Sequence, residues 1–89
     1  MTKREMNEAM ADRLEKFAVK TYERQMRNVD NDEDYKECCR LDLADTRKIA
    51  YYLRQNKLNE AYRVMFRLDT AARDNLPESV AGYIAEEAD

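Results

Sequence analysis

Two amphipathic segments joined by a very short polar connection place the strongest constraint on this sequence. The connection, Gln55-Asn56-Lys57, has residues that favour a turn. On each side of it, apolar or small residues recur three and four positions apart, which is the spacing of one helix face. These residues are Thr46, Ile49, Ala50 and Leu53 before the turn and Leu58, Ala61, Met65, Leu68 and Ala72 after it. Because so short a connection makes the two helices antiparallel neighbours, the sequence predicts a central helical hairpin.

The composition favours helix along the whole chain. The 89 residues include one glycine, one proline and many good helix formers. A chain of this length forms one small domain with a modest core. We therefore predict an all-α fold, a small bundle of three to four helices in a single domain, residues 1–89. The predicted core contains Phe17, Tyr22, Ile49, Leu53, Ala61, Met65 and Leu68.

The N-terminal helix is predicted to be long for so small a protein. Thr2 and Glu5 fit a capping box, and helical periodicity continues from there to about Asn28. Only part of this length can face the hairpin, so we expect the first apolar turns to be left uncovered. A second copy of the chain would cover them across a two-fold axis. The sequence thus predicts a homodimer with an interface that contains Met6, Met10 and Leu14.

The second helix is predicted to start near Asp32, with Asn31 or Asp32 as its N-cap, and to run to Gln55, with Asn56 as a left-handed C-cap. Asp42 lies close to the apolar face of this helix, and a buried carboxylate needs a partner. Either Asp42 pairs with an arginine of another helix, or the helix breaks near Ala44. We favour one continuous helix.

Polar segments separate the other helices. Residues 29–34 lack periodicity and predict a loop, which is missing the glycine and glutamate of a calcium-binding EF-hand. A third helix is predicted over residues 58–74. It ends before Pro77, which is well suited to the first position of a fourth helix.

The residue types argue against an enzyme. The chain has no histidine and one glycine, so a histidine-based acid–base or metal site and a glycine-rich phosphate loop are excluded. Cys38 and Cys39 are adjacent and seldom bond in that arrangement, so we expect reduced thiols in a cytoplasmic protein. Neither a membrane span nor a signal peptide is apparent. We expect no metal and no cofactor.

The distribution of charge indicates a binding surface. The net charge is −3, yet residues 45–73 carry seven Lys or Arg against three Asp or Glu. Arginine and tyrosine are favoured at interfaces, and arginine pairs well with carboxylate or phosphate. The predicted partner-binding residues are Arg47, Tyr51, Arg54, Arg63 and Arg67.

Two functions from different classes fit this basic surface. One is a non-enzymatic module that binds a larger protein and modulates or inhibits it. The alternative is a nucleic-acid-binding regulator that uses the basic hairpin, residues 45–73. The negative net charge favours the protein partner, since DNA-binding domains are usually clearly basic. Self-association without another partner and an ordinary solvated face are the remaining interpretations.

Two segments resemble known proteins. Residues 49–68 resemble a single tetratricopeptide hairpin, in which a tyrosine and a small alanine, here Tyr52 and Ala61, let two helices pack closely. Residues 67–84, RLDTAARDNLPESVAGYI, resemble stretches of small accessory proteins of tailed bacteriophages. The second resemblance implies a cytoplasmic product that binds a host protein or complex.

Overall fold

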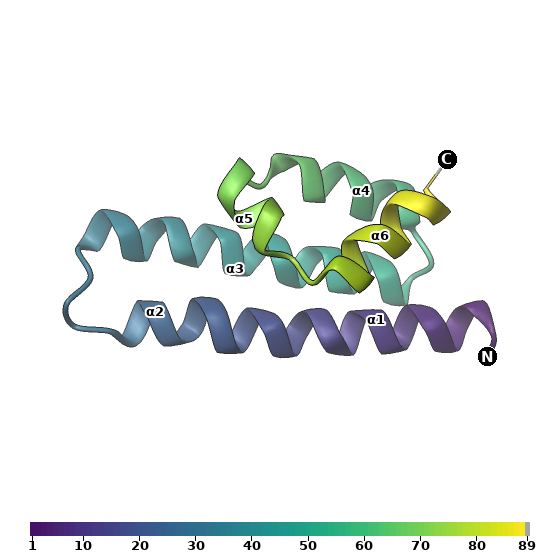
Figure 1. Cartoon of the computed structure of the whole chain (residues 1–89), viewed down its shortest axis with the longest axis horizontal. Helices are drawn as coiled ribbons and strands as arrows, with labels where there is room; N and C mark the ends of the chain where they lie inside the picture. The colour runs from purple at the N-terminus through teal and green to yellow at the C-terminus, as the bar shows by residue number, and fades with distance from the viewer. Residues whose placement is uncertain (89) are drawn as a thin grey trace.

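The structure, a computed structural model, describes residues 1–88, and every regular element in that range is helical. The elements are α1 (Lys3–Ala18), the π-helical turn η1 (Val19–Glu23), α2 (Arg24–Arg27), α3 (Glu33–Arg54), α4 (Leu58–Arg67), α5 (Thr70–Asn75) and α6 (Glu78–Glu87). The segments α1, η1 and α2 follow one another without a break and form one rod (Figure 1). The predicted all-α class and the long N-terminal helix are confirmed.

Local capping explains where the helices begin and end. Thr2 and Glu5 form the predicted capping box, because the Thr2 hydroxyl accepts from the Glu5 amide and the Glu5 carboxylate accepts from the Thr2 amide. Asp32 caps α3 by accepting from the amide of Tyr35 at 2.6 Å. Asn56 has a positive φ of 57°, so it is the predicted left-handed residue that ends α3.

The prediction of a single third helix over residues 58–74 is wrong, because the structure has two helices there. Instead, α4 ends at Arg67, Leu68 is extended, and α5 starts after Asp69. The Asp69 side chain accepts from the Ala72 amide at 2.8 Å and so caps a new helix within the predicted one. Arg73 supports the break by donating to the Leu68 carbonyl at 3.2 Å.

The helices form layers of unequal length. The rod and α3 lie antiparallel over most of the molecule, and α4 folds back along α3 (Figure 1). Helix α6 contacts both α1 and α4, so this half of the molecule is thicker than the half that holds α2. The molecule measures 43 × 20 × 19 Å. Within residues 1–88, no helix combines the length and the apolar character that crossing a bilayer requires.

Two clusters of buried residues follow this layering. The main cluster joins α1, α3, α4 and α6, and includes the predicted core residues Ile49, Leu53, Ala61, Met65 and Leu68. The small cluster consists of Ala18, Tyr22, Cys39 and Leu43, near the loop that joins α2 to α3. Phe17 is half-buried and packs against both clusters. Ala61 is fully buried and Tyr52 packs against the main cluster, which agrees with the close packing expected of them.

Part of the apolar surface expected for a second copy is covered within the chain. Leu14 is fully buried, and Met10 packs against the main cluster. The prediction left these residues open because it did not place the predicted fourth helix, α6, against α1. Leu14 is therefore unavailable to a second copy, while contact of Met6 or Met10 with a second copy and the homodimer itself stay predictions.

A buried asparagine joins three segments that are distant in sequence. Asn7 is 2% exposed; its side-chain amide donates to the Asn56 carboxamide oxygen at 3.0 Å, and its own oxygen accepts from the Tyr83 hydroxyl. These bonds connect α1 to the turn after α3 and to α6. Because a buried amide must be satisfied, Asn7 fixes the relative positions of these segments.

We expect Leu53→Ala to lower the free energy of unfolding by about 2–5 kcal/mol, because it opens a cavity at a fully buried position. The matched change Leu41→Ala on the same helix removes a side chain that is 51% exposed, and should cost less than about 0.5 kcal/mol. Urea denaturation followed by circular dichroism measures both. Equal midpoints for the two variants would contradict the assigned core.

Candidate functional site

Arg54 forms ion pairs within the chain with three carboxylates of α1. Its guanidinium lies 3.2 Å from Glu8, 2.5 Å from Asp12 and 2.6 Å from Glu15, all on α1. Hydrogen bonding, led by that to Glu15, raises the pKa of Arg54, and only 27% of its side chain is exposed. Arg54 therefore joins α3 to α1, while its contact with a partner stays a prediction.

The other predicted binding residues are not gathered on one surface. Arg47 pairs with Glu23 of the rod at 2.6 Å, so this arginine also faces α1. The Tyr51 ring is half exposed and stacks on Tyr52. Arg63 and Arg67 are exposed on α4, which packs on the other side of α3 (Figure 1). Contact of Tyr51, Arg63 or Arg67 with a partner stays a prediction.

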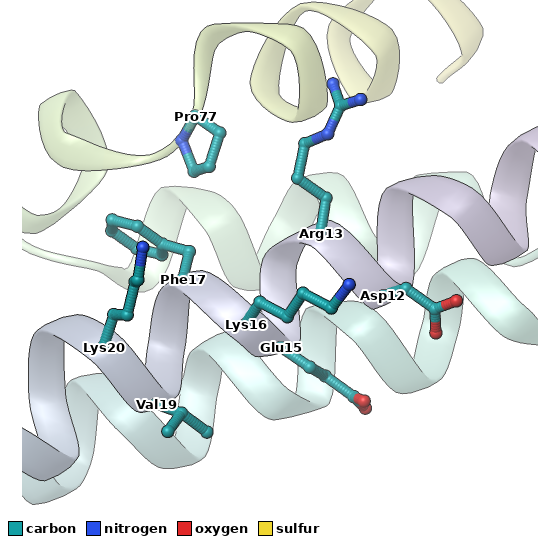
Figure 2. Close-up of a pocket in the computed structure, with 8 residues that line it drawn as sticks. All are labelled: Asp12, Arg13, Glu15, Lys16, Phe17, Val19, Lys20 and Pro77. Carbon is teal, nitrogen blue, oxygen red and sulfur yellow. The ribbon is translucent and has the colours of Figure 1, made fainter.

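A basic, apolar groove lies between α1, η1 and the start of α6, and the sequence analysis did not single it out. The groove encloses about 700 Å³ and is open to solvent. Its lining residues, shown in Figure 2, are Asp12, Arg13, Glu15, Lys16, Phe17, Val19, Lys20 and Pro77. Phe17, Val19 and Pro77 supply its apolar surface.

The uncompensated charge of this groove is positive. Asp12 and Glu15 point away from Phe17 and Pro77 in Figure 2, and both are held by Arg54. Lys16 and Lys20 make no ion pair within the described range, residues 1–88. Arg13 donates to the Ser79 hydroxyl at 2.6 Å, a neutral partner that leaves its charge unbalanced.

A second, acidic cleft lies where η1, α3 and α5 meet. It encloses about 430 Å³. Its lining residues are Thr21, Tyr22, Gln25, Tyr35, Cys38, Cys39, Asp42, Asp69, Ala71, Ala72 and Asn75. Burial, Asp42 and Asp69 together raise the pKa of Tyr22 to about 12. Burial also raises the pKa of the Cys39 thiol, so that this cysteine is protonated at neutral pH.

The favoured continuous helix through Asp42 is confirmed, but the arginine partner expected for this carboxylate is not found among residues 1–88. Helix α3 continues through this position, supported by the Thr46 hydroxyl, which donates to the Asp42 carbonyl at 2.7 Å. No arginine or lysine of the described chain lies within ion-pair distance of the Asp42 carboxylate. Burial, followed by the charges of Asp69 and Asp45, raises its pKa. The acidic cleft thus retains an unneutralised carboxylate.

The described residues 1–88 contain no set of three His, Cys, Asp or Glu side chains arranged to hold a metal ion. Cys38 is exposed and Cys39 is buried, and both are free thiols. No described protein family, characterised protein or solved structure matches this chain. Its function is therefore inferred from its own residues.

Replacing Arg54 should weaken the fold. We expect Arg54→Met to lower the free energy of unfolding by about 1–2 kcal/mol, because it leaves three neighbouring carboxylates without their cation. The control Arg47→Met removes one exposed pair and should cost less than about 1 kcal/mol. Urea titration measures both variants. A larger loss for Arg47→Met would refute the assigned role of Arg54.

Asp42→Asn should stabilise the fold at neutral pH. Because the folded-state pKa of Asp42 is raised, its ionised form is less favourable in the folded chain than in the unfolded chain. This destabilisation is full above the folded-state pKa and disappears as the pH falls below the ordinary value of 3.8. Thermal unfolding should show a higher midpoint for the variant at neutral pH and no difference in acid. A lower midpoint at neutral pH would contradict this account.

Proposed function

We propose that this protein is a small non-enzymatic module that binds a larger protein through the basic, apolar groove beside Phe17. The observation that carries the proposal is the pairing of an apolar surface with three cations, Arg13, Lys16 and Lys20, none of which forms an ion pair with the groove's carboxylates, Asp12 and Glu15. Such a site suits a segment of opposite charge. The expected ligand is an acidic segment with apolar side chains on one face.

The shape of the groove supports a peptide ligand. Amphipathic segments dock by laying their apolar face into a groove whose rim carries complementary charge. Here Phe17 and Pro77 come from α1 and from the start of α6, so the apolar surface spans two elements that pack on each other. A groove formed by rigid helices needs little reordering when its ligand binds, which favours affinity.

The nucleic-acid alternative has less support, because part of the basic hairpin is neutralised within the chain. Arg47 and Arg54 pair with carboxylates of the rod, and Arg73 lies 4.7 Å from the centre of the Phe66 ring. Arg63 and Arg67 carry the remaining exposed arginine charge of α4. The resemblance of residues 67–84 to phage accessory proteins favours a host protein as partner, in the cytoplasm, and modulation or inhibition as the outcome.

The test compares two matched double variants. Lys16→Gln/Lys20→Gln removes two charges from the groove, and Arg63→Gln/Arg67→Gln removes two charges from α4. We expect the groove variant to bind the captured host protein at least tenfold more weakly, about 1.4 kcal/mol, and the α4 variant to bind like wild type.

Affinity capture from nuclease-treated host lysate, followed by titration of the purified partner, makes the measurement. Equal affinity of the groove variant and wild type would exclude the groove. Capture that requires nucleic acid, with a steep dependence on salt and a loss in the α4 variant, would instead support the nucleic-acid function.

A further inference from the structure

Residues 29–34, which we call the acidic tip, are the densest run of acidic residues in the chain. The tip consists of the turn after α2 and the start of α3, and it forms one end of the long axis of the molecule (Figure 1). Its carboxylates are all exposed, on Asp30, Asp32, Glu33 and Asp34. Val29, beside them, is 87% exposed. The tip therefore combines negative charge with an open apolar side chain.

Most of the charge of the acidic tip is left without a cation in the chain. The carboxylates of Asp30 and Asp34 make no ion pair within residues 1–88. Glu33 lies 3.7 Å from Lys36, but its side chain is 91% exposed, so this pair contributes little. The tip thus presents unpaired carboxylates to any molecule that reaches this end of the protein.

Hydrogen bonds hold the acidic tip in a defined conformation. The Asn31 side-chain amide donates to the Gln25 carbonyl at 2.8 Å, and the Asn28 side-chain oxygen accepts from the Asp30 amide at 3.0 Å. The cap that Asp32 provides to α3 fixes the other end of the turn. A segment that is already ordered loses little conformational freedom when it docks, which favours binding.

The basic groove beside Phe17 is complementary to the acidic tip. The groove pairs apolar surface from Phe17 and Pro77 with cations that make no ion pair within residues 1–88 (Figure 2). These cations are Arg13, Lys16 and Lys20. The groove was proposed to bind an acidic segment with apolar side chains, and the tip is such a segment.

The groove and the tip of one chain cannot meet. Both belong to the same rod, and the helix between Phe17 and Arg27 is continuous, which separates them by about 15 Å along the axis. Other carboxylates of the chain are less available, since Asp12 and Glu15 are bound by Arg54 and Glu87 pairs with Lys3. The tip of another copy is therefore the best-matched occupant that this chain offers to the groove.

We propose that the basic groove of one copy binds the acidic tip of a second copy. Val29 of the tip contacts Phe17, and the carboxylates of Asp30 and Asp34 pair with Lys16 and Lys20. The inference rests on the proposed function, because it uses the same groove, and it adds a means of regulation. A groove that holds a tip cannot hold the larger protein, so self-association lowers the amount of protein that is free to bind its partner.

The oligomeric state of the full-length protein gives the first test. Sedimentation equilibrium should show a mass that rises above that of the monomer between micromolar and millimolar concentration at low salt. Because groove and tip are different surfaces, the contact either forms twice across a two-fold axis or adds copies head to tail, and both raise the mass. High salt should reduce the association, since it screens exposed charges. A monomer at millimolar concentration and low salt would overturn the proposal.

Exchanging the charges of the two surfaces locates the contact. The groove variant Lys16→Glu/Lys20→Glu and the tip variant Asp30→Lys/Asp34→Lys each place like charges opposite each other, so each alone should associate at least about tenfold more weakly than wild type. An equimolar mixture should associate again, because the reversed groove then meets the reversed tip. Wild-type association of the tip variant alone, or a mixture that stays monomeric, would exclude this contact.

A matched control separates the contact from net charge. Asp74→Lys/Glu86→Lys makes the same change in net charge as the tip variant at exposed positions of α5 and α6. It should associate like wild type, and circular dichroism should show the same helix content in all variants. Association that weakens as much in this control as in the tip variant would mean that net charge, and not the tip, is responsible.

This inference and the proposed function fail separately. The tip variant keeps its groove, so it should bind the purified host partner at least as tightly as wild type does. Wild-type protein that binds the partner through the groove but stays monomeric would overturn self-association and leave the proposed function standing. Protein that associates through groove and tip but binds no partner would overturn the proposed function alone.

Discussion

The packing of the N-terminal rod against α3 is the contact on which the rest of this structure depends. It runs along most of the molecule and supplies residues to both buried clusters. Helices α4 and α6 add a further layer over one half only, where the main cluster lies (Figure 1). The other half is two helices thick, and its small cluster has few apolar side chains with which to cover polar groups. The unsatisfied Tyr22 hydroxyl and the unpaired Asp42 carboxylate lie beside this small cluster.

The basic groove and the acidic cleft differ in charge but border the same turn of helix. Val19 and Lys20 line the basic groove, whereas the next two residues, Thr21 and Tyr22, line the acidic cleft. The internal ion pairs determine this separation. Arg54 pairs with Asp12 and Glu15, so the cations of the groove have no ion-pair partner there, and within residues 1–88 no arginine pairs with the cleft carboxylates Asp42 and Asp69.

Features that depend on neighbouring residues could be predicted from the sequence. The Thr2–Glu5 capping box, the apolar faces and the left-handed Asn56 each follow from residues within one helical turn of each other. The partners of Arg54 and Asn7 lie about half the chain away, so periodicity indicated a helix face without indicating what opposes it. For the same reason Arg54 was assigned to a partner, Leu14 to a second copy, and the groove beside Phe17 was missed. The break at Leu68 was missed for a different reason. Asp69 is a local capping residue, but the apolar spacing of residues 58–72 favoured one continuous helix.

The π-helical turn also sets the phase between the two halves of the rod. Before it, buried positions follow one another at intervals of four and three residues, as in Ala11, Leu14 and Ala18. After Ala18 the next inward positions, Tyr22 and Met26, come at intervals of four, which in a regular α-helix would drift by about 40° per step. The wider turn absorbs this drift. Deleting one residue between positions 19 and 23 would therefore convert the turn to regular α-helix and leave all that follows in nearly the same rotational position relative to α1. The π-helical turn thus accommodates one extra residue, and both ends of the rod keep facing α3.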